Sequence, residues 1–169
     1  MNILTSRFNT STWKENCEYR EKIGHTGSLY CSPQKITEKI PLNALAYVVE
    51  MNNSTNQILG IGLIRNALYH GKRLNVYEVN NYNRYNYKGN YRLDREIIQN
   101  TYPQIVIILE QILFKGKTHL KRGSGLISIS EKIFIQNKIL EKFNYTEYQI
   151  REELSILFKR HFSEETINT

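Results

Sequence analysis

The sequence predicts a single α+β domain, in which helices flank a small, curved, mixed β-sheet or barrel and also form the C-terminal third of the chain. Two apolar, β-prone runs joined by turn-forming residues indicate a β-hairpin. Apolar residues at helical spacing indicate helices after Thr101. With 169 residues, 40% of them hydrophobic, the chain can bury one core without disulfides or metal ions. We expect residues 1–162 to form the domain and residues 163–169 a frayed tail.

The first part of the chain carries alternating, amphipathic and turn patterns in succession. They predict a strand over 2–8, an amphipathic helix over 13–22 with its cap at Ser11 or Thr12, a short strand over 27–31 and a helical turn over 34–40. The hairpin follows over 44–51 and 57–65, with five turn formers between its strands. Gly60 and Gly62 lie on one face of its second strand. Their missing side chains would let another backbone, an aromatic ring or a ligand approach closely.

The second half begins with an alternating segment, 74–79, which predicts another strand. The polar, Tyr- and Asn-rich segment 80–91 predicts an exposed loop or an irregular strand pair. Helices are expected over 94–99, from Pro103 to about Gly116, over 131–143 and over 147–162. A basic loop, 115–125, and a short apolar run, 126–129, separate the second of these helices from the third.

The positive charge of the chain is concentrated in one segment. The formal net charge is +7. Between Ile61 and Gly125, eleven Lys and Arg residues stand against four acidic residues, so this segment alone carries the whole excess. Codon bias would spread Lys along the chain, whereas a localised excess points to a polyanionic partner. A solvated surface that happens to be basic is the alternative.

A first cluster of rings and cations lies within this segment, over 82–92. Interleaved cations and rings suit a strand of phosphates and bases, because cations neutralise phosphate and each ring offers a stacking face. The alternative is a surface loop whose tyrosines pack onto the fold under the stems of Arg and Lys. The candidate binding residues are Arg84, Tyr85, Tyr87, Lys88, Tyr91 and Arg92.

A second cluster is the Gly-containing basic loop over 115–125. Its glycines can free backbone N–H groups to face an anion, although a solvated loop explains the pattern equally well. The loop is not a P-loop, because it follows a predicted helix and lacks the upstream glycine of that motif. The candidate phosphate-binding residues are Lys117, His119, Lys121 and Arg122.

Motifs for catalysis, metal or cofactor binding are not expected. The four histidines fall in unrelated segments, and neither Cys17 nor Cys31 belongs to a metal-binding or disulfide pattern. A structural role is expected for Cys31, which could act as a nucleophile only if a distant histidine folded beside it. A metal-dependent nuclease would need several of the acidic residues to converge near Lys88 or Lys121. Those acidic residues are Glu50, Glu78, Asp94 and Glu96.

The order of strand, Trp-bearing helix, short strand and hairpin over Asn2–Val79 resembles the PUA-like superfamily, with its EVE, ASCH and YTH branches. The hairpin strand 57–64, Gln-Ile-Leu-Gly-Ile-Gly-Leu-Ile, carries the resemblance. The resemblance implies a PUA-like barrel that binds RNA or DNA, often with a modified base in a cleft. The residues placed near such a pocket would be Trp13, Tyr30, Tyr47, Gly60 and Gly62. The aromatic cage of the YTH branch has more tryptophan than this chain. The composition also resembles proteins of large AT-rich DNA viruses.

Three functions therefore stay open at this point. The first is non-catalytic binding of RNA or DNA. The second is a viral structural or packaging component, which would self-associate, meet virion partners or expose an apolar patch on its C-terminal helices. The third is the nuclease. The N-terminus does not resemble a signal peptide and no apolar run is long enough to span a membrane, so we expect a cytoplasmic, nuclear or virion protein without a membrane partner.

Overall fold

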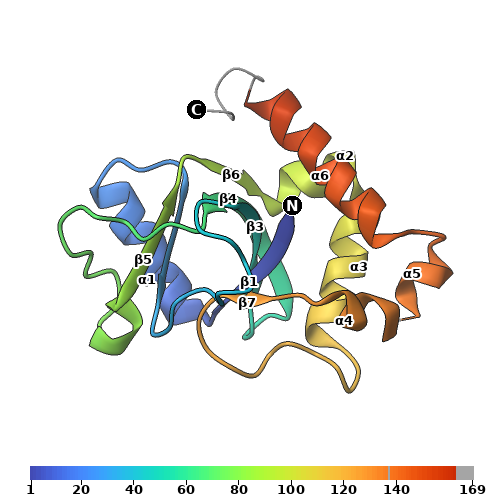
Figure 1. The fold of residues 1–169 in the computed structure, drawn as a ribbon, viewed down its shortest axis with the longest axis horizontal. Coiled ribbons are helices and arrows are strands. Elements are labelled where there is room, and N and C mark those ends of the chain that lie inside the picture. Colours follow the sequence, from blue (N-terminus) through green and yellow to red (C-terminus); the bar gives the residue numbers. More distant parts are fainter. Residues whose placement is uncertain (137, 163–169) are drawn as a thin grey trace.

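The computed structural model describes residues 1–136 and 138–162, and it confirms the α+β class with a helical C-terminal third (Figure 1). The expected tail, 163–169, lies outside the described residues. The elements follow in the order β1 (Asn2–Phe8), α1 (Thr10–Lys22), β2 (Ser28–Ser32), β3 (Leu45–Asn52), β4 (Gln57–Arg65), η1 (Asn80–Asn83), β5 (Tyr85–Gly89), β6 (Tyr91–Asp94), α2 (Arg95–Thr101), α3 (Pro103–Phe114), β7 (Ile127–Ser128), α4 (Glu131–Gln136), α5 (Ile139–Lys142) and α6 (Glu147–His161).

The main sheet has five strands in the order β6-β4-β3-β1-β7. β1 and β3 run parallel, with Phe8 opposite Asn52, and the other pairs are antiparallel. β2 and β5 form a separate two-stranded antiparallel sheet. Within the described residues these pairings do not close a barrel, so of the two forms expected the structure has the open sheet.

Each face of the main sheet is covered by a different layer. Side chains alternate along β1, so that Ile3 faces α2, α3, α4 and α6 while Leu4 faces α1, β2 and β5. The same alternation places Tyr47 on the helical side and Val48 on the other. In Figure 1 the sheet stands between α1 and β5 on the left and α3, α4 and α6 on the right.

The two sheets approach closely at Gly89 of β5, and Gly27, which precedes β2, lies against the same glycine. A Cβ at Gly89 would lie 2.0 Å from the Leu63 carbonyl oxygen, and a Cβ at Gly27 would lie 2.1 Å from the Gly89 carbonyl oxygen. Distances this short cannot accommodate a side chain. Glycine at these positions therefore lets β5 cross the end of β4 in near backbone contact.

α1 begins earlier than the sequence predicts. Asn9, not Ser11 or Thr12, is the N-cap, and its side chain accepts a hydrogen bond from Thr12 N at 2.8 Å. The Thr12 hydroxyl in turn accepts from Asn9 N at 3.0 Å, which completes a capping box. The helix therefore starts directly at the carboxyl end of β1.

The strand expected over 74–79 is absent. The Asn83 side chain accepts hydrogen bonds from Val76 N at 3.0 Å and Tyr77 N at 2.9 Å, and donates to Tyr77 O at 2.6 Å. These backbone groups are thereby satisfied by one buried side chain instead of a neighbouring strand. Two smaller expectations also differ, since 34–40 is not helical and the helix over 131–143 is divided into α4 and α5.

The expected loop or strand pair over 80–91 is η1, β5 and the beginning of β6. The hairpin and the remaining helices agree with the prediction to within a few residues. In the described part of the chain, no helix has both the length and the apolar character that a membrane crossing requires.

Candidate nucleic-acid interface

Gly60 and Gly62, the two glycines of the hairpin, lie where large side chains from other strands cross β4. This confirms the prediction that another group approaches the backbone closely at these positions. A Cβ at Gly62 would come within 2.1 Å of Tyr30 Oη and 2.5 Å of Ser28 Cβ. A Cβ at Gly60 would lie 2.7 Å from Arg92 Nη2. The space that the glycines leave is therefore occupied by an aromatic ring and a guanidinium of the protein itself.

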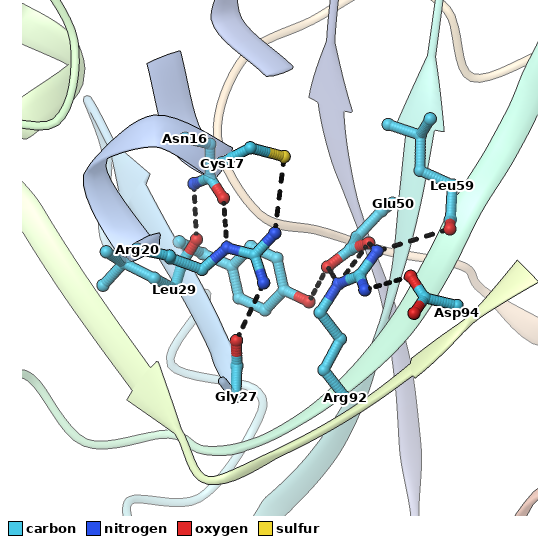
Figure 2. A network of polar contacts seen from close by, with 10 residues as sticks. Asn16, Cys17, Arg20, Gly27, Leu29, Glu50, Leu59, Arg92 and Asp94 are labelled. Atoms are coloured by element: carbon cyan, nitrogen blue, oxygen red, sulfur yellow. Dashed lines mark hydrogen bonds and ion pairs between the residues drawn. The ribbon is translucent and has the colours of Figure 1, made fainter. Parts of the chain in front are cut away.

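That guanidinium belongs to a buried ion network (Figure 2). Arg92 Nε lies 2.9 and 3.0 Å from the two carboxylate oxygens of Glu50, and Arg92 Nη2 lies 2.7 Å from Glu50 Oε2. Tyr30 donates its hydroxyl to Glu50 Oε1 at 2.8 Å, and Asp94 accepts from Arg92 Nη1 at 2.5 Å. Glu50 is only 1% exposed. Arg92 is thus bound inside the protein.

The pKa values of this network agree with its geometry. Burial alone would lower the pKa of Arg92, but the charge and hydrogen bonds of Glu50 outweigh it and hold the guanidinium in its charged form. Burial, together with the neighbouring charge of Glu50, raises the pKa of Tyr30 well above its usual value. Tyr30 therefore stays a neutral hydrogen-bond donor.

Trp13 covers the outer side of the network. Its ring lies 5.2 Å from Arg92 Cζ and 5.4 Å from Arg20 Cζ, within cation–π distance of both. Arg20 in turn donates to Asn16 Oδ1 at 3.0 Å and to the Gly27 carbonyl at 3.1 Å. These contacts join α1 to β2 and to the main sheet.

The pocket that the resemblance implies is therefore filled by side chains. Trp13, Tyr30, Gly60 and Gly62 do converge on one side of the sheet, but around Arg92 instead of an empty cleft. Tyr47 does not join them, because it faces the helical layer and packs against the Phe158 ring at 5.2 Å. None of these five residues lines the main clefts of the described structure.

The tyrosine-rich cluster is divided among three environments. Arg92 is internal, as described above, and Tyr87 is 2% exposed, with its hydroxyl accepting a hydrogen bond from Ile36 N at 2.9 Å. Tyr85 is half-buried, with Arg84 Cζ 5.5 Å from its ring centroid. Lys88, near the far end of β5, and Tyr91, at the start of β6, line a cleft that contains no other candidate residue of this cluster.

One residue at the start of this segment, Tyr82, faces the second cluster across a cleft. The cleft has a volume of about 230 Å³ and lies at the carboxyl ends of the parallel strands β1 and β3, beside the N-terminus of α1. We call it the Arg7 cleft. Its lining residues are Ser6, Arg7, Phe8, Asn9, Thr12, Cys31, Pro33, Asn53, Tyr77, Tyr82, Gly123, Ser124 and Gly125.

Arg7 shapes the basic loop from inside. Its Nε donates to the Leu120 carbonyl at 2.6 Å and its Nη1 to the Gly125 carbonyl at 3.2 Å. Asn53 Nδ2 donates to the Lys121 carbonyl at 3.0 Å from the other side. Side chains from β1 and the β3–β4 turn therefore hold the loop against the sheet. The segments that hold the two predicted clusters reach this cleft only through Tyr82 and residues 123–125, and none of the candidate binding residues named for either cluster lines it.

The charge of Arg7 has no counter-ion among the described residues. No described carboxylate forms an ion pair with it, and its acceptors are two carbonyls and Thr5 Oγ1 at 3.5 Å. A guanidinium has five N–H donors, so two remain for a ligand. Burial lowers the pKa of Arg7, which expresses the cost of a half-buried charge without a partner. An anion in the cleft would offset that cost.

The remaining candidates of the basic loop lie at varying distances from the cleft. Arg122 is exposed and immediately precedes Gly123, which lines the cleft. The backbone carbonyl of Lys121 is held beside the cleft by its hydrogen bond from Asn53. His119 Nδ1 accepts from Lys121 N at 3.3 Å, and Lys117 is exposed. None of these four residues lines the cleft.

The described residues of the cleft supply neither a reactive thiolate nor a gathered set of metal ligands. Cys31 is part of the lining, but burial raises the pKa of its thiol to about 12, so it is protonated at neutral pH. Glu50 and Asp94 both bind Arg92 instead of converging with Glu78 and Glu96, which are exposed or nearly so. Across residues 1–136 and 138–162, no three Asp, Glu, His or Cys side chains gather as metal ligands do.

Arg7, Asn53 and Tyr82 were not among the sequence candidates. Arg7 is the penultimate residue of the strand predicted over 2–8, and Asn53 lies in a predicted turn. Neither position shows which residues fold beside it. The only sequence signal was Tyr82 at the edge of the tyrosine-rich segment. Comparison with protein-family models, curated proteins and solved structures gave no significant match.

Proposed function

We propose that this protein binds single-stranded RNA or DNA non-covalently, with a phosphate in the Arg7 cleft and a base against Tyr82. The observation that carries the proposal is the half-buried Arg7 guanidinium without a counter-ion, in a cleft whose described lining contains no acidic residue. An anionic ligand supplies the missing charge. The alternative is that the two carbonyls alone stabilise Arg7.

The neighbouring groups suit a nucleotide better than a free anion. Tyr82 is 38% exposed, and its ring is braced by an edge contact with Tyr77 at 6.2 Å between centroids. A braced, accessible ring is a stacking surface for a base. Lys121 and Arg122 beside the lining add charges for the next phosphates.

The PUA-like relationship remains part of the proposal. The strand, helix, strand and hairpin occur in the expected order as β1, α1, β2 and β3–β4, which supports it. The filled space around Gly60 and Gly62 argues that a ligand would enter the Arg7 cleft and not the region beneath the hairpin. We place this binding function in the cytoplasm or nucleus, because a reducing compartment keeps the free thiols Cys17 and Cys31 from oxidising.

The proposal is tested by fluorescence anisotropy with labelled single-stranded DNA and RNA oligonucleotides. Three variants are compared with the wild type: Tyr82→Ala, Lys121→Glu/Arg122→Glu, and Lys142→Glu as a control on exposed α5, which has no residue in the cleft. Tyr82→Ala should weaken binding by about 1–3 kcal/mol, the value of one stacked base. The double variant should weaken it further, and Lys142→Glu should have little effect.

Circular dichroism and thermal melting show whether each variant is folded. Equal weakening by Lys142→Glu and the double variant would reduce the interaction to net charge and would contradict a defined site. An undetectable interaction between the wild type and both nucleic acids at low salt would also contradict the proposal. The ratio of RNA to DNA affinity identifies the natural ligand class.

A second candidate function, self-association, is favoured by a separate observation. A groove of about 490 Å³ between α4 and α6 is lined by Phe134, Ile135, Leu140 and Tyr148, among others. Ile135 is 70% exposed and Tyr148 is 71% exposed. An exposed apolar patch on the C-terminal helices supports a structural or packaging role, although Glu131, Glu147 and Arg151 also line this groove.

Analytical ultracentrifugation tests this second candidate. If a second copy covers the groove, the wild type should dimerise with increasing concentration, and Ile135→Glu/Tyr148→Glu should stay monomeric while retaining its melting temperature. A wild type that is monomeric throughout would remove this candidate. The outcome does not affect the Arg7 cleft, because the groove and the cleft share no lining residue.

A further inference from the structure

A second basic cleft opens at the other end of β3. It has a volume of about 560 Å³, and we call it the Tyr69 cleft. Arg65, His70 and Lys88 contribute to its wall, Tyr69 and Tyr91 supply rings, and none of its described lining residues is acidic. Two further clefts of the described structure both contain glutamates. A lining without carboxylates among its described residues is therefore a property that the Tyr69 cleft shares with the Arg7 cleft.

The Tyr69 ring is held as a stacking surface. Tyr69 N donates to the Asn86 carbonyl at 2.8 Å, which ties this loop to β5. A Cβ at Gly71 would lie 2.1 Å from Tyr69 Oη, so glycine there lets the chain pass close to the ring. Lys88 Nζ lies 5.6 Å from the ring centroid. A base stacked at Tyr69, which is 38% exposed, would therefore bring its phosphate within reach of an ammonium group.

One continuous segment connects the two clefts. Tyr82 belongs to the Arg7 cleft, and the chain then runs through η1 and β5 to Lys88 and Gly89 in the Tyr69 cleft. The length of β3 gives the distance between the two clefts. Leu45, at the start of β3, lines the Tyr69 cleft, and Asn53, just beyond the end of β3, lines the Arg7 cleft. At ~3.3 Å per residue, the distance from the first to the last of the eight residues of β3 is roughly 23 Å. With ~3.4 Å per stacked nucleotide, about seven nucleotides cover that length.

We propose that the Tyr69 cleft is a second subsite for the same strand, taking a base on Tyr69 and a phosphate between Lys88 and Arg65. This inference rests on the proposed function and adds a site size to it. A strand of about seven nucleotides or more engages both clefts, whereas a trinucleotide engages one. Long oligonucleotides are therefore preferred beyond what their extra charge explains.

The test compares oligothymidylates of about three and about fifteen nucleotides, one much shorter and one longer than the span between the clefts. Affinities are measured for the wild type, Lys88→Glu, Tyr69→Ala and the control Lys142→Glu. Tyr69→Ala should weaken binding of the long oligonucleotide by about fivefold or more, because one stacked base no longer has its ring. Lys88→Glu should reduce the preference for the long over the short oligonucleotide, and its salt slope should fall by about 0.7 for each phosphate that the protein no longer neutralises.

The result separates this inference from the proposed function. If Lys121→Glu/Arg122→Glu weakens both lengths while Lys88→Glu and Tyr69→Ala leave the length preference unchanged, the second subsite is refuted and the Arg7 cleft stands. Failure of the wild type to bind either length refutes both. Tyr69→Ala removes no charge, so its effect distinguishes a stacking subsite from a general electrostatic field.

Discussion

Glu50, on β3, binds Arg92, on β6, across the intervening strand β4. The pair meets over Gly60, where a Cβ would lie 2.7 Å from Arg92 Nη2 and 3.0 Å from Glu50 Oε2. Both side chains are almost fully buried. A two-point ion pair therefore joins strands that share no backbone ladder, and it depends on a glycine between them.

Replacing Glu50 with Gln should destabilise the protein strongly. The substitution leaves the Arg92 charge buried with only Asp94 beside it, and removing one partner of a buried pair costs about 3–5 kcal/mol. Denaturant unfolding measures the change. The control is Glu18→Gln, which breaks the exposed Lys14–Glu18 pair and should cost less than about 1 kcal/mol. Equal, small decreases in both variants would show that the buried pair is not stabilising.

Gly62→Ala should also destabilise the fold, because the added Cβ would lie 2.1 Å from Tyr30 Oη. Overpacking of this kind costs about 1–3 kcal/mol. Tyr30→Phe removes the closest atom, so the double variant should be destabilised by less than the sum of the two single variants. A double-mutant cycle on the free energy of unfolding measures this coupling. Strict additivity would show that the Tyr30 hydroxyl and the added methyl group do not compete for this space.

Stability should fall at alkaline pH. Burial raises the pKa of Cys31 to about 12, and it raises the pKa values of Tyr30 and Tyr77 above their usual range. In the unfolded chain these groups ionise near pH values of about 8.5 and about 10. Above those values the unfolded state releases protons that the folded state retains, so the free energy of unfolding decreases as pH rises.

Urea midpoints measured from neutral pH to about pH 11 would record this decrease, beginning near the unfolded thiol pKa. Cys31→Ala should flatten the first part of the profile and leave the later, tyrosine-dependent part. A midpoint that stays constant over the whole range would contradict the burial of these groups.

Local patterns predicted the elements that local interactions determine. The hairpin over β3 and β4 was predicted with its close-approach glycines, because alternation and turn residues are visible within a short window. α6 was predicted over 147–162, and its N-cap Thr146 forms a capping box with Gln149. The prediction for segment 74–79 failed because Asn83, several residues later, satisfies its backbone groups.

The geometry of the site could not be predicted in the same way, because it depends on contacts between residues that lie far apart in the sequence. Arg92 stood among the predicted surface cations, yet its partner Glu50 lies 42 positions earlier in the chain. Arg7 had no basic neighbours to mark it, and its contacts with Leu120 and Gly125 lie more than 100 positions away. Charge counting indicated the central segment, but the topology decided which of its cations lie at the surface.

Phosphate binding at Arg7 is tested most directly by the salt dependence of single-stranded oligonucleotide affinity in the wild type and in Arg7→Gln. Gln retains an amide donor for the loop carbonyls, and thermal melting checks that the variant is folded. The logarithm of the wild-type association constant should fall linearly with the logarithm of salt concentration, and Arg7→Gln should bind more weakly with a slope smaller by about 0.7. Identical slopes and affinities for the two proteins would contradict a phosphate at Arg7.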